Sequence, residues 1–213
     1  DVCSYLNEGL SIYFENRALG YEQIDYSRNE LRELEVKNEV IQPGRIASEY
    51  AVYLFPKKYY KYLRARVKAN RADCGDRFLD IVRIRTNALN ATLRDPMWKP
   101  SYQFEETIAD EGHDGLYVYY DKDDFSVGEL HIDYLRVPNE IHCPSCKKNQ
   151  SDPYLYGDGR IIKKDSGLEL TATDSARKIV DLAVLCAYRD VGDIEDYNSQ
   201  LQKILQTYTI FTN

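Results

Sequence analysis

The chain has 213 residues, of which 43% are hydrophobic and 30% are charged, so it can bury a core while its surface stays highly charged. Its net charge of -7 disfavours a dedicated nucleic-acid binder, because such proteins draw most of their affinity from Lys and Arg set against phosphates. No run of 18 apolar residues is present, so no membrane partner is expected. The excess of Tyr (19, against 6 Phe) favours surfaces that are half buried and half wet, as protein interfaces are.

Helices are predicted at the N-terminal end. Apolar residues between Val2 and Phe14 recur at helical spacing, which predicts a helix over residues 2–17. A second helix is predicted over residues 25–37, with Leu31 and Leu34 facing inward.

The centre of the chain changes to the alternating pattern of strands. In residues 62–69, one face carries Leu63, Ala65, Val67 and Ala69, and the other carries Tyr62, Arg64, Arg66 and Lys68. Residues 78–85 form a second strand candidate, and the turn at residues 73–76 joins the two into a hairpin. A short helix over residues 87–93 follows, and further strands are predicted at 102–108, 116–120 and 127–137.

The C-terminal third begins with turn-forming residues over 142–167, which predict a long loop. The strongest helix pattern starts at Thr173 or Asp174. Its apolar stripe consists of Ala176, Ile179, Val180, Ala183, Val184 and Ala187. A last helix is predicted over residues 194–206, followed by a strand-like tail over residues 207–213.

These elements predict an α+β fold with an antiparallel β-sheet core flanked by N-terminal and C-terminal helices. The simplest organisation is a single domain over residues 1–213.

Motifs for catalysis or cofactor binding are missing from the sequence. It has no phosphate-binding Gly-rich loop, no nucleophile elbow and no paired-histidine zinc motif, and its three histidines are scattered. Asp114 and Glu129 are the carboxylates that a hydrolase would use, although such a pair is expected by chance among 35 acidic residues. We therefore predict no enzyme activity and no cofactor.

The cysteines offer one weak metal candidate. Cys143 and Cys146 have the spacing of a zinc-binding pair, but no second pair follows to complete four ligands. A plain surface loop is the favoured interpretation. The odd count of five cysteines is typical of a chain made in a reducing cytoplasm and not of a disulfide framework.

Two surfaces are candidates for interactions. The basic residues of the predicted hairpin would form a positive patch facing neighbouring subunits or DNA, and they are Arg64, Arg66, Lys68, Arg83 and Arg85. The alternative is an exposed sheet face balanced by neighbouring acids. In the tail, Tyr208, Ile210 and Phe211 would let the chain add a strand to a neighbour's sheet, with packing on its own sheet as the alternative.

Three segments in order along the chain carry a family resemblance. They are Asp1 to Leu10 (with Leu31-Arg32-Glu33-Leu34 further on), Leu130 to Pro138, and Ile179-Val180-Asp181-Leu182-Ala183-Val184. Together they resemble neck proteins of tailed phages of Bacteroidota, including the ring proteins of crAss-like podoviruses. Two features depart from that pattern: Gly9 stands where Ala is usual, and the loop over residues 142–167 with its Cys pair is not expected.

The resemblance implies a virion structural protein, a ring-forming neck or head-tail connector subunit of a podovirus made in the host bacterial cytoplasm. It implies a homo-oligomeric ring, expected to be a dodecamer, that joins the portal protein to other neck and tail proteins and lets genomic DNA pass without sequence-specific binding. No residue of that family is catalytic. The alternatives are a non-catalytic accessory protein that binds an acidic ligand on the Arg64/Arg66/Lys68 face, and a carboxylate-based hydrolase.

Overall fold

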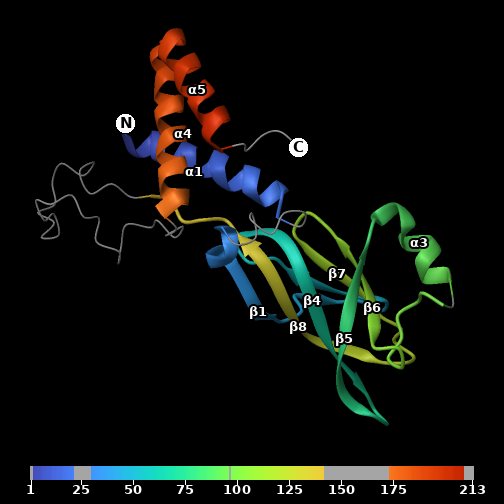
Figure 1. The fold of residues 1–213 in the computed structure, drawn as a ribbon. Coiled ribbons are helices and arrows are strands. Elements are labelled where there is room, and N and C mark those ends of the chain that lie inside the picture. Colours follow the sequence, from blue (N-terminus) through green and yellow to red (C-terminus); the bar gives the residue numbers. More distant parts are fainter. Residues whose placement is uncertain (1, 22–29, 96, 142–172, 209–213) are drawn as a thin grey trace, which may run out of the picture. The chain divides into compact units, whose positions relative to one another are not determined.

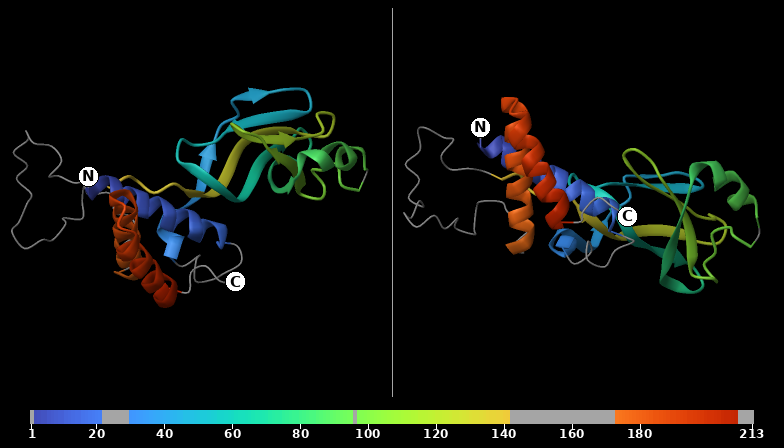
Figure 2. Two further views of the ribbon diagram at one scale, coloured as in Figure 1. Left: turned by 90° about the horizontal axis from the view of Figure 1, so that it is seen from above. Right: turned by 45° about the horizontal axis from the view of Figure 1, so that its top comes forward.

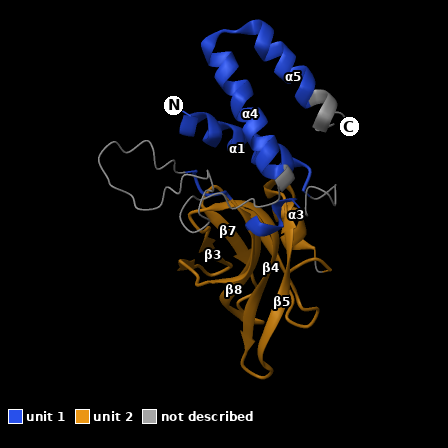
Figure 3. Ribbon diagram, turned by 60° about the vertical axis from the view of Figure 1, so that its left-hand side comes forward, with its two compact units in different colours: residues 1–34, 137–213 blue, residues 35–136 orange. Residues whose placement is uncertain are grey.

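The computed structural model describes residues 2–21, 30–95, 97–141 and 173–208, except for the side chains of 173–174 and 205–208. The chain divides into two compact units, shown in Figure 3. We call residues 1–34 with 137–213 the helical unit, and residues 35–136 the sheet unit. The predicted α+β class is confirmed, whereas the single domain over 1–213 stays a prediction.

The helical unit contains α1 (Val2–Leu19), the short 3-10 helix η1 (Arg32–Leu34), α4 (Thr173–Val191) and α5 (Ile194–Tyr208), labelled in Figure 1. No helix in the described part of the chain is long and apolar enough to cross a lipid bilayer.

Helices α4 and α5 form an antiparallel hairpin, visible in Figure 1 and in the right view of Figure 2. Helix α4 ends at Gly192, whose φ of 78° is costly for residues with a Cβ, and the N–H groups of Gly192 and Asp193 both donate to the carbonyl oxygen of Tyr188. Asp193 then caps α5, because its carboxylate accepts from the N–H of Asp196 at 3.1 Å. The hairpin turn is therefore specified locally.

Helices α1 and α4 approach each other closely at Gly9. A Cβ at this position would lie 2.6 Å from the carbonyl oxygen of Ile179 and 2.8 Å from the backbone nitrogen of Ala183. Both neighbours are backbone atoms, which cannot rotate aside as a side chain can. The unusual Gly9 is thus explained by the distance between the two helices.

Asn7, two residues earlier, attaches the segment that follows the sheet unit. Its amide donates to the carbonyl oxygen of Ile141 at 3.0 Å, and its side-chain oxygen accepts from the Ile141 N–H at 2.6 Å. This pair of hydrogen bonds satisfies both backbone polar groups of one residue.

A buried ionic cluster joins α1, α4 and Glu30, which lies just before η1. The Glu30 carboxylate lies 2.6 Å from Arg17 Nε and 3.0 Å from Lys178 Nζ, and all three side chains are at most one-tenth exposed. Beside it, the Tyr13 hydroxyl and Ser175 Oγ share a hydrogen bond of 2.9 Å. A buried charge is costly unless an opposite charge lies beside it, so these ion pairs restrict how α1 and α4 can pack against each other.

Three helix predictions need correction. Residues 22–29 lie outside the description, and Leu31 and Leu34 are buried as predicted, but residues 35–37 belong to a strand. In α4, Val180 and Val184 are exposed, and Leu182 and Cys186 are buried in their place. Thr207 and Tyr208 continue α5 and do not start a strand-like tail.

The sheet unit contains α3 (Thr86–Arg94) and one curled sheet. Its strands are β1 (Glu35–Ile41), β2 (Arg45–Ile46), β3 (Tyr50–Leu54), β4 (Tyr59–Arg71), β5 (Gly75–Ile84), β6 (Glu106–Glu111), β7 (Gly115–Tyr119) and β8 (Ser126–Arg136). They are ordered β1-β8-β4-β5-β6-β7-β3-β2, with β1 and β2 at the edges. The predicted hairpin, the short helix and the last two predicted strands are all present.

One strand pair departs from the predicted antiparallel core. Strands β5 and β6 run parallel, from Asp80 opposite Glu106 to Ile84 opposite Asp110. Parallel neighbours need a crossover connection, and α3 with the turn after it provides this connection. Strand β6 also begins at Glu106, later than the predicted Tyr102.

Irregularities in β1 and β4 interrupt the alternation of the side chains. The pairing of β4 with β8 shifts between Tyr62 and Arg64, so Tyr62 is buried although the alternation places it on the polar face. In β1, the register shifts at Asn38, which has a φ of 55° and donates its N–H to Asp133. Such bulges increase the local twist of a sheet.

Tyrosines build much of the core of the sheet unit. The hydroxyl of Tyr53 on β3 donates to the carbonyl oxygen of Gly128 on β8, although these strands are not neighbours in the sheet. Tyr102 donates to the carbonyl oxygen of Gly75, Tyr59 to Glu111 and Tyr134 to Glu39. The hydroxyl groups of these four tyrosines thus have acceptors while their rings pack in or against the core.

The substitution Gly9→Ala should destabilise the helical unit. The added methyl group clashes with backbone, which typically costs about 1–3 kcal/mol, against a gain of roughly 1 kcal/mol in helix propensity. We expect a net loss of about 1 kcal/mol in the free energy of unfolding, measured by urea denaturation. Gly44→Ala is the control, because its Cβ would meet nothing closer than 3.5 Å. Equal stability of both variants would contradict the close helix approach.

The buried tyrosines predict unfolding in alkali. Burial raises the pKa of Tyr13, Tyr62 and Tyr134 to about 12 and shifts that of Tyr53 and Tyr59 in the same direction. Because these pKa values lie above the unfolded value of 10.0, their contribution to stability is complete below pH 10 and is lost as the pH rises through 12. Tyrosinate absorbance at 295 nm should therefore rise together with loss of the far-UV circular dichroism signal. Ionisation of all tyrosines near pH 10 in a folded protein would refute this.

Candidate interaction surface

The predicted basic residues of β4 share the outer face of the sheet. Arg66 lies opposite Asp80 of β5 and His131 of β8, and directly opposite residues in antiparallel strands point to the same face. Arg64 and Lys68, two residues to either side, extend this row. The structure therefore brings three of the five predicted patch residues together.

Acidic residues on both neighbouring strands compensate this row. Arg64 lies 3.0 Å from Asp80, and Lys68 lies 3.1 Å from Asp76 and 3.8 Å from Glu129. The hydrogen bond that Arg64 donates to Asp80 raises the pKa of Arg64, and the one that Lys68 donates to Asp76 raises the pKa of Lys68. The pKa of Asp76 is lowered, first by its hydrogen bond from Asn70 and then by Lys68. The face is thus a set of exposed ion pairs and not a positive patch.

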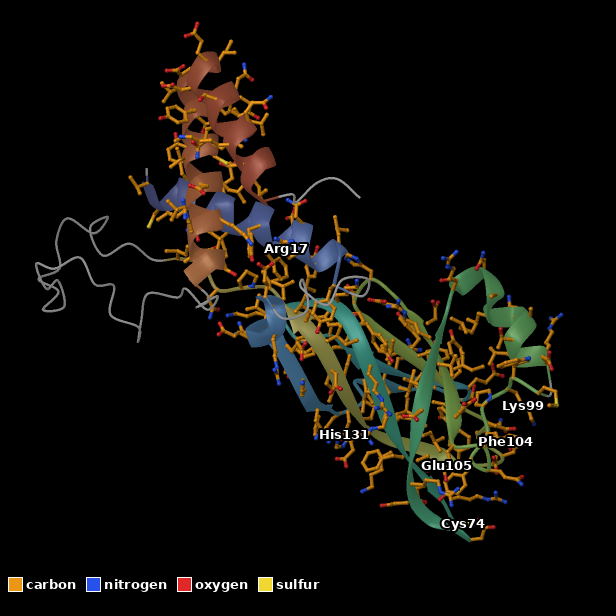
Figure 4. All side chains as sticks on the ribbon, viewed as in Figure 1. Arg17, Cys74, Lys99, Phe104, Glu105 and His131 are labelled. Atoms are coloured by element: carbon orange, nitrogen blue, oxygen red, sulfur yellow. The ribbon has the colours of Figure 1, made fainter. Side chains whose placement is uncertain are left out.

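Arg66 is placed differently. Its guanidinium lies 5.5 Å from the centre of the Phe78 ring, and Phe78 in turn meets the ring of His131 edge-on at 4.8 Å. His131, labelled in Figure 4, shares a hydrogen bond of 2.9 Å with Asn38 of β1. The recess between these groups measures about 30 Å³, so it has room for little more than water and not for an acidic metabolite.

Arg83 and Arg85 do not join this row. Arg83 projects from the opposite face of β5, where it lies 2.7 Å from Glu111 and 5.1 Å from the Tyr62 ring centre. Arg85 is exposed and immediately precedes α3. The five predicted residues therefore do not form one patch, because side chains alternate between the two faces of β5. Counting residues along the predicted strand already puts Arg83 on the other face.

A second surface was missed at the sequence level. Side chains from β5, β6, α3 and the turn after it surround a hollow of about 330 Å³. We call it the apolar groove, and its apolar lining consists of Val82, Ile84, Met97, Trp98, Phe104 and Ile108. Lys99 and Phe104, which contribute to it, are labelled in Figure 4. The clustering of Met97, Trp98 and Phe104 in a turn was the available sequence signal.

The groove is lined by residues that remain largely exposed. Met97, Trp98 and Phe104 are 79%, 64% and 67% exposed, and Val82 is 41% exposed. A small-molecule pocket encloses most of its ligand, whereas large exposed side chains beside one hollow are typical of a protein contact. Unlike the basic row, this surface has unsatisfied apolar area to bury.

The remaining candidates do not form a chemical site. Asp114 lies in the turn between β6 and β7 beside His113, and Glu129 lies on β8 beside Lys68. No group of three or more potential metal ligands occurs among the residues that the structure describes. Cys143, Cys146, Ile210 and Phe211 lie outside the described residues, as does the side chain of Tyr208. Among the described cysteines, Cys74 and Cys186 are free thiols and Cys3 is disulfide-bonded.

No known protein family matches the chain, and no curated protein does either.

Because acids pair with Arg64 and Lys68 in the basic row, we predict weak binding to DNA, which should become stronger when these acids are neutralised. In Asp76→Asn/Asp80→Asn, Arg64 loses its carboxylate partner Asp80 and Lys68 loses the nearer of its two, and affinity for a labelled duplex at low salt should rise roughly tenfold. Fluorescence anisotropy measures the change. The control Asp114→Asn/Asp123→Asn alters the net charge equally at a distance from the row in sequence. Equal gains in both variants would mean that only net charge matters.

Proposed function

We propose that the chain is a non-catalytic virion structural protein, a ring-forming neck or adaptor subunit that connects the portal to the tail and lets DNA pass. Its partners are identical subunits in a ring, the portal protein and other neck or tail proteins. The proposal begins from the resemblance to phage neck proteins and is supported by what the resembling residues do in the fold.

The observation that carries the proposal is that these residues build a scaffold. The first segment contacts the third through Gly9, which itself departs from the family pattern and lets α1 approach α4 at Ile179 and Ala183. Asn7 of the first segment bonds both backbone groups of Ile141, three residues after the second segment ends at Pro138. Segments far apart in the sequence thus have an architectural role, as expected for a protein that acts through its shape.

Two surface properties fit the same function. The charge-balanced outer face of β4 suits DNA that must move past without being held, since retention requires unpaired cations. The apolar groove offers area for contact with another protein. The accessory-protein alternative is less well supported, because the basic row is paired and its recess is small.

Location in the particle tests the proposal. An antibody raised against the chain should label the junction of head and tail in intact phage particles seen by negative-stain electron microscopy. An antibody to the major capsid protein, labelling the whole shell, is the control. Absence of the polypeptide from purified particles, or label spread over the shell, would refute the neck assignment.

A further inference from the structure

Besides the groove, the described part of the chain exposes apolar side chains at the turn of a helix hairpin. At the turn between α4 and α5, Val191 is 79% and Ile194 is 71% exposed, on either side of Gly192 and Asp193. We call residues 190–196 the acidic tip. Its conformation is specified by the Gly192 turn and the Asp193 cap, so the two aliphatic side chains are presented on a defined support.

The charges at the two features are opposite. Besides Val191 and Ile194, the tip carries Asp190, Asp193, Glu195 and Asp196, and neither Glu195 nor Asp196 makes an ion pair among the described residues. The segment next to the groove carries Arg85 and Arg94 at the two ends of α3, and these have no carboxylate partner in the described part of the chain.

Local structure explains part of this pattern but not all of it. Acidic residues in the first turn of α5 favour the helix dipole, and Lys99 beside the groove is already 3.5 Å from Asp121. Glu106, which lines the groove, is the one acid there that opposes an acidic partner. Neither fact accounts for two isolated aliphatic side chains at a hairpin turn, or for three large apolar side chains around a hollow.

We propose that the acidic tip of one copy of the chain inserts Val191 and Ile194 into the apolar groove of a second copy, with Glu195 and Asp196 facing Arg85 and Arg94. Because the two surfaces differ, the contact is heterologous and leaves one free groove and one free tip on every pair, so it propagates into a ring or a filament. The inference rests on the proposed function only in its use of a ring, since contact between copies can be measured without any phage component.

Two variants of the full chain test it. Trp98→Asp places a charge in the groove, and Ile194→Asp places one on the tip; both sites are largely exposed, so the fold should tolerate the changes. The wild-type chain should self-associate with rising concentration in sedimentation velocity, and each variant should weaken this by about tenfold or more. Leu19→Asp and Ile46→Asp, at exposed aliphatic positions elsewhere, are controls that should behave as the wild type.

Mixing the two variants is the decisive measurement. The Trp98→Asp protein keeps its tip and the Ile194→Asp protein keeps its groove, so the mixture should form a one-to-one dimer that grows no further. Wild-type chain that stays monomeric at all concentrations, or a mixture that stays monomeric, would overturn the inference. Self-association of either variant at wild-type strength would do the same.

A charge exchange provides an independent check. Arg94→Glu and Glu195→Arg should each weaken association, and the double variant should recover it, because the pair is restored in reversed order. Loss without recovery would remove these two residues from the contact. Absence of the chain from the particle neck, by contrast, would refute the proposed function and leave this contact intact.

Discussion

The helical unit depends on the short distance between α1 and α4 at Gly9. Because no Cβ separates the two backbones there, the same crossing brings Arg17 of α1 and Lys178 of α4 to the carboxylate of Glu30. These buried cations tolerate little displacement from the carboxylate, since separating opposite charges is costly in a medium of low dielectric. Close packing and buried charge thus reinforce each other. This coupling gives the α4–α5 hairpin, and the turn at its end, a rigid base.

The sheet unit achieves its curl by other means. Bulges in β1 and β4 increase the twist, and the parallel β5–β6 pair admits the crossover through α3. A strongly curled sheet has a narrow interior, in which tyrosine rings fill the volume while their hydroxyls reach backbone and carboxylate acceptors. The abundance of Tyr, which the composition associates with half-wet interfaces, is therefore used in part for the core.

Local signals in the sequence predict the regular parts of this structure. The alternation over residues 62–69 and the turn at 73–76 identify the β4–β5 hairpin, and helical spacing identifies α1 and α4. The prediction fails where tertiary pairing overrides the pattern: residues 35–37 are predicted to end the helix over 25–37, but they begin β1, which pairs with the distant strand β8. Arg83 was assigned to the wrong face although counting along β5 separates it from Arg64. The groove could not be predicted as a site, because four elements supply its walls.

The net charge of -7 does not show where unpaired charge lies on the surface, and the ion pairs of the structure do show this. On β4, each exposed cation except Arg66 faces an acid across the sheet, so the strongest basic run of the sequence contributes little field beyond its own surface. Charges that form no ion pair in the described part of the chain include Arg85 and Arg94 at the ends of α3 and Glu195 and Asp196 of the acidic tip, and these lie near exposed apolar side chains in the sequence. Burial of apolar area drives an association, and opposite charges orient the partners. The apolar groove and the acidic tip each combine exposed apolar side chains with nearby charge. Such a distribution favours contacts between copies of the chain over contacts with a polyanion.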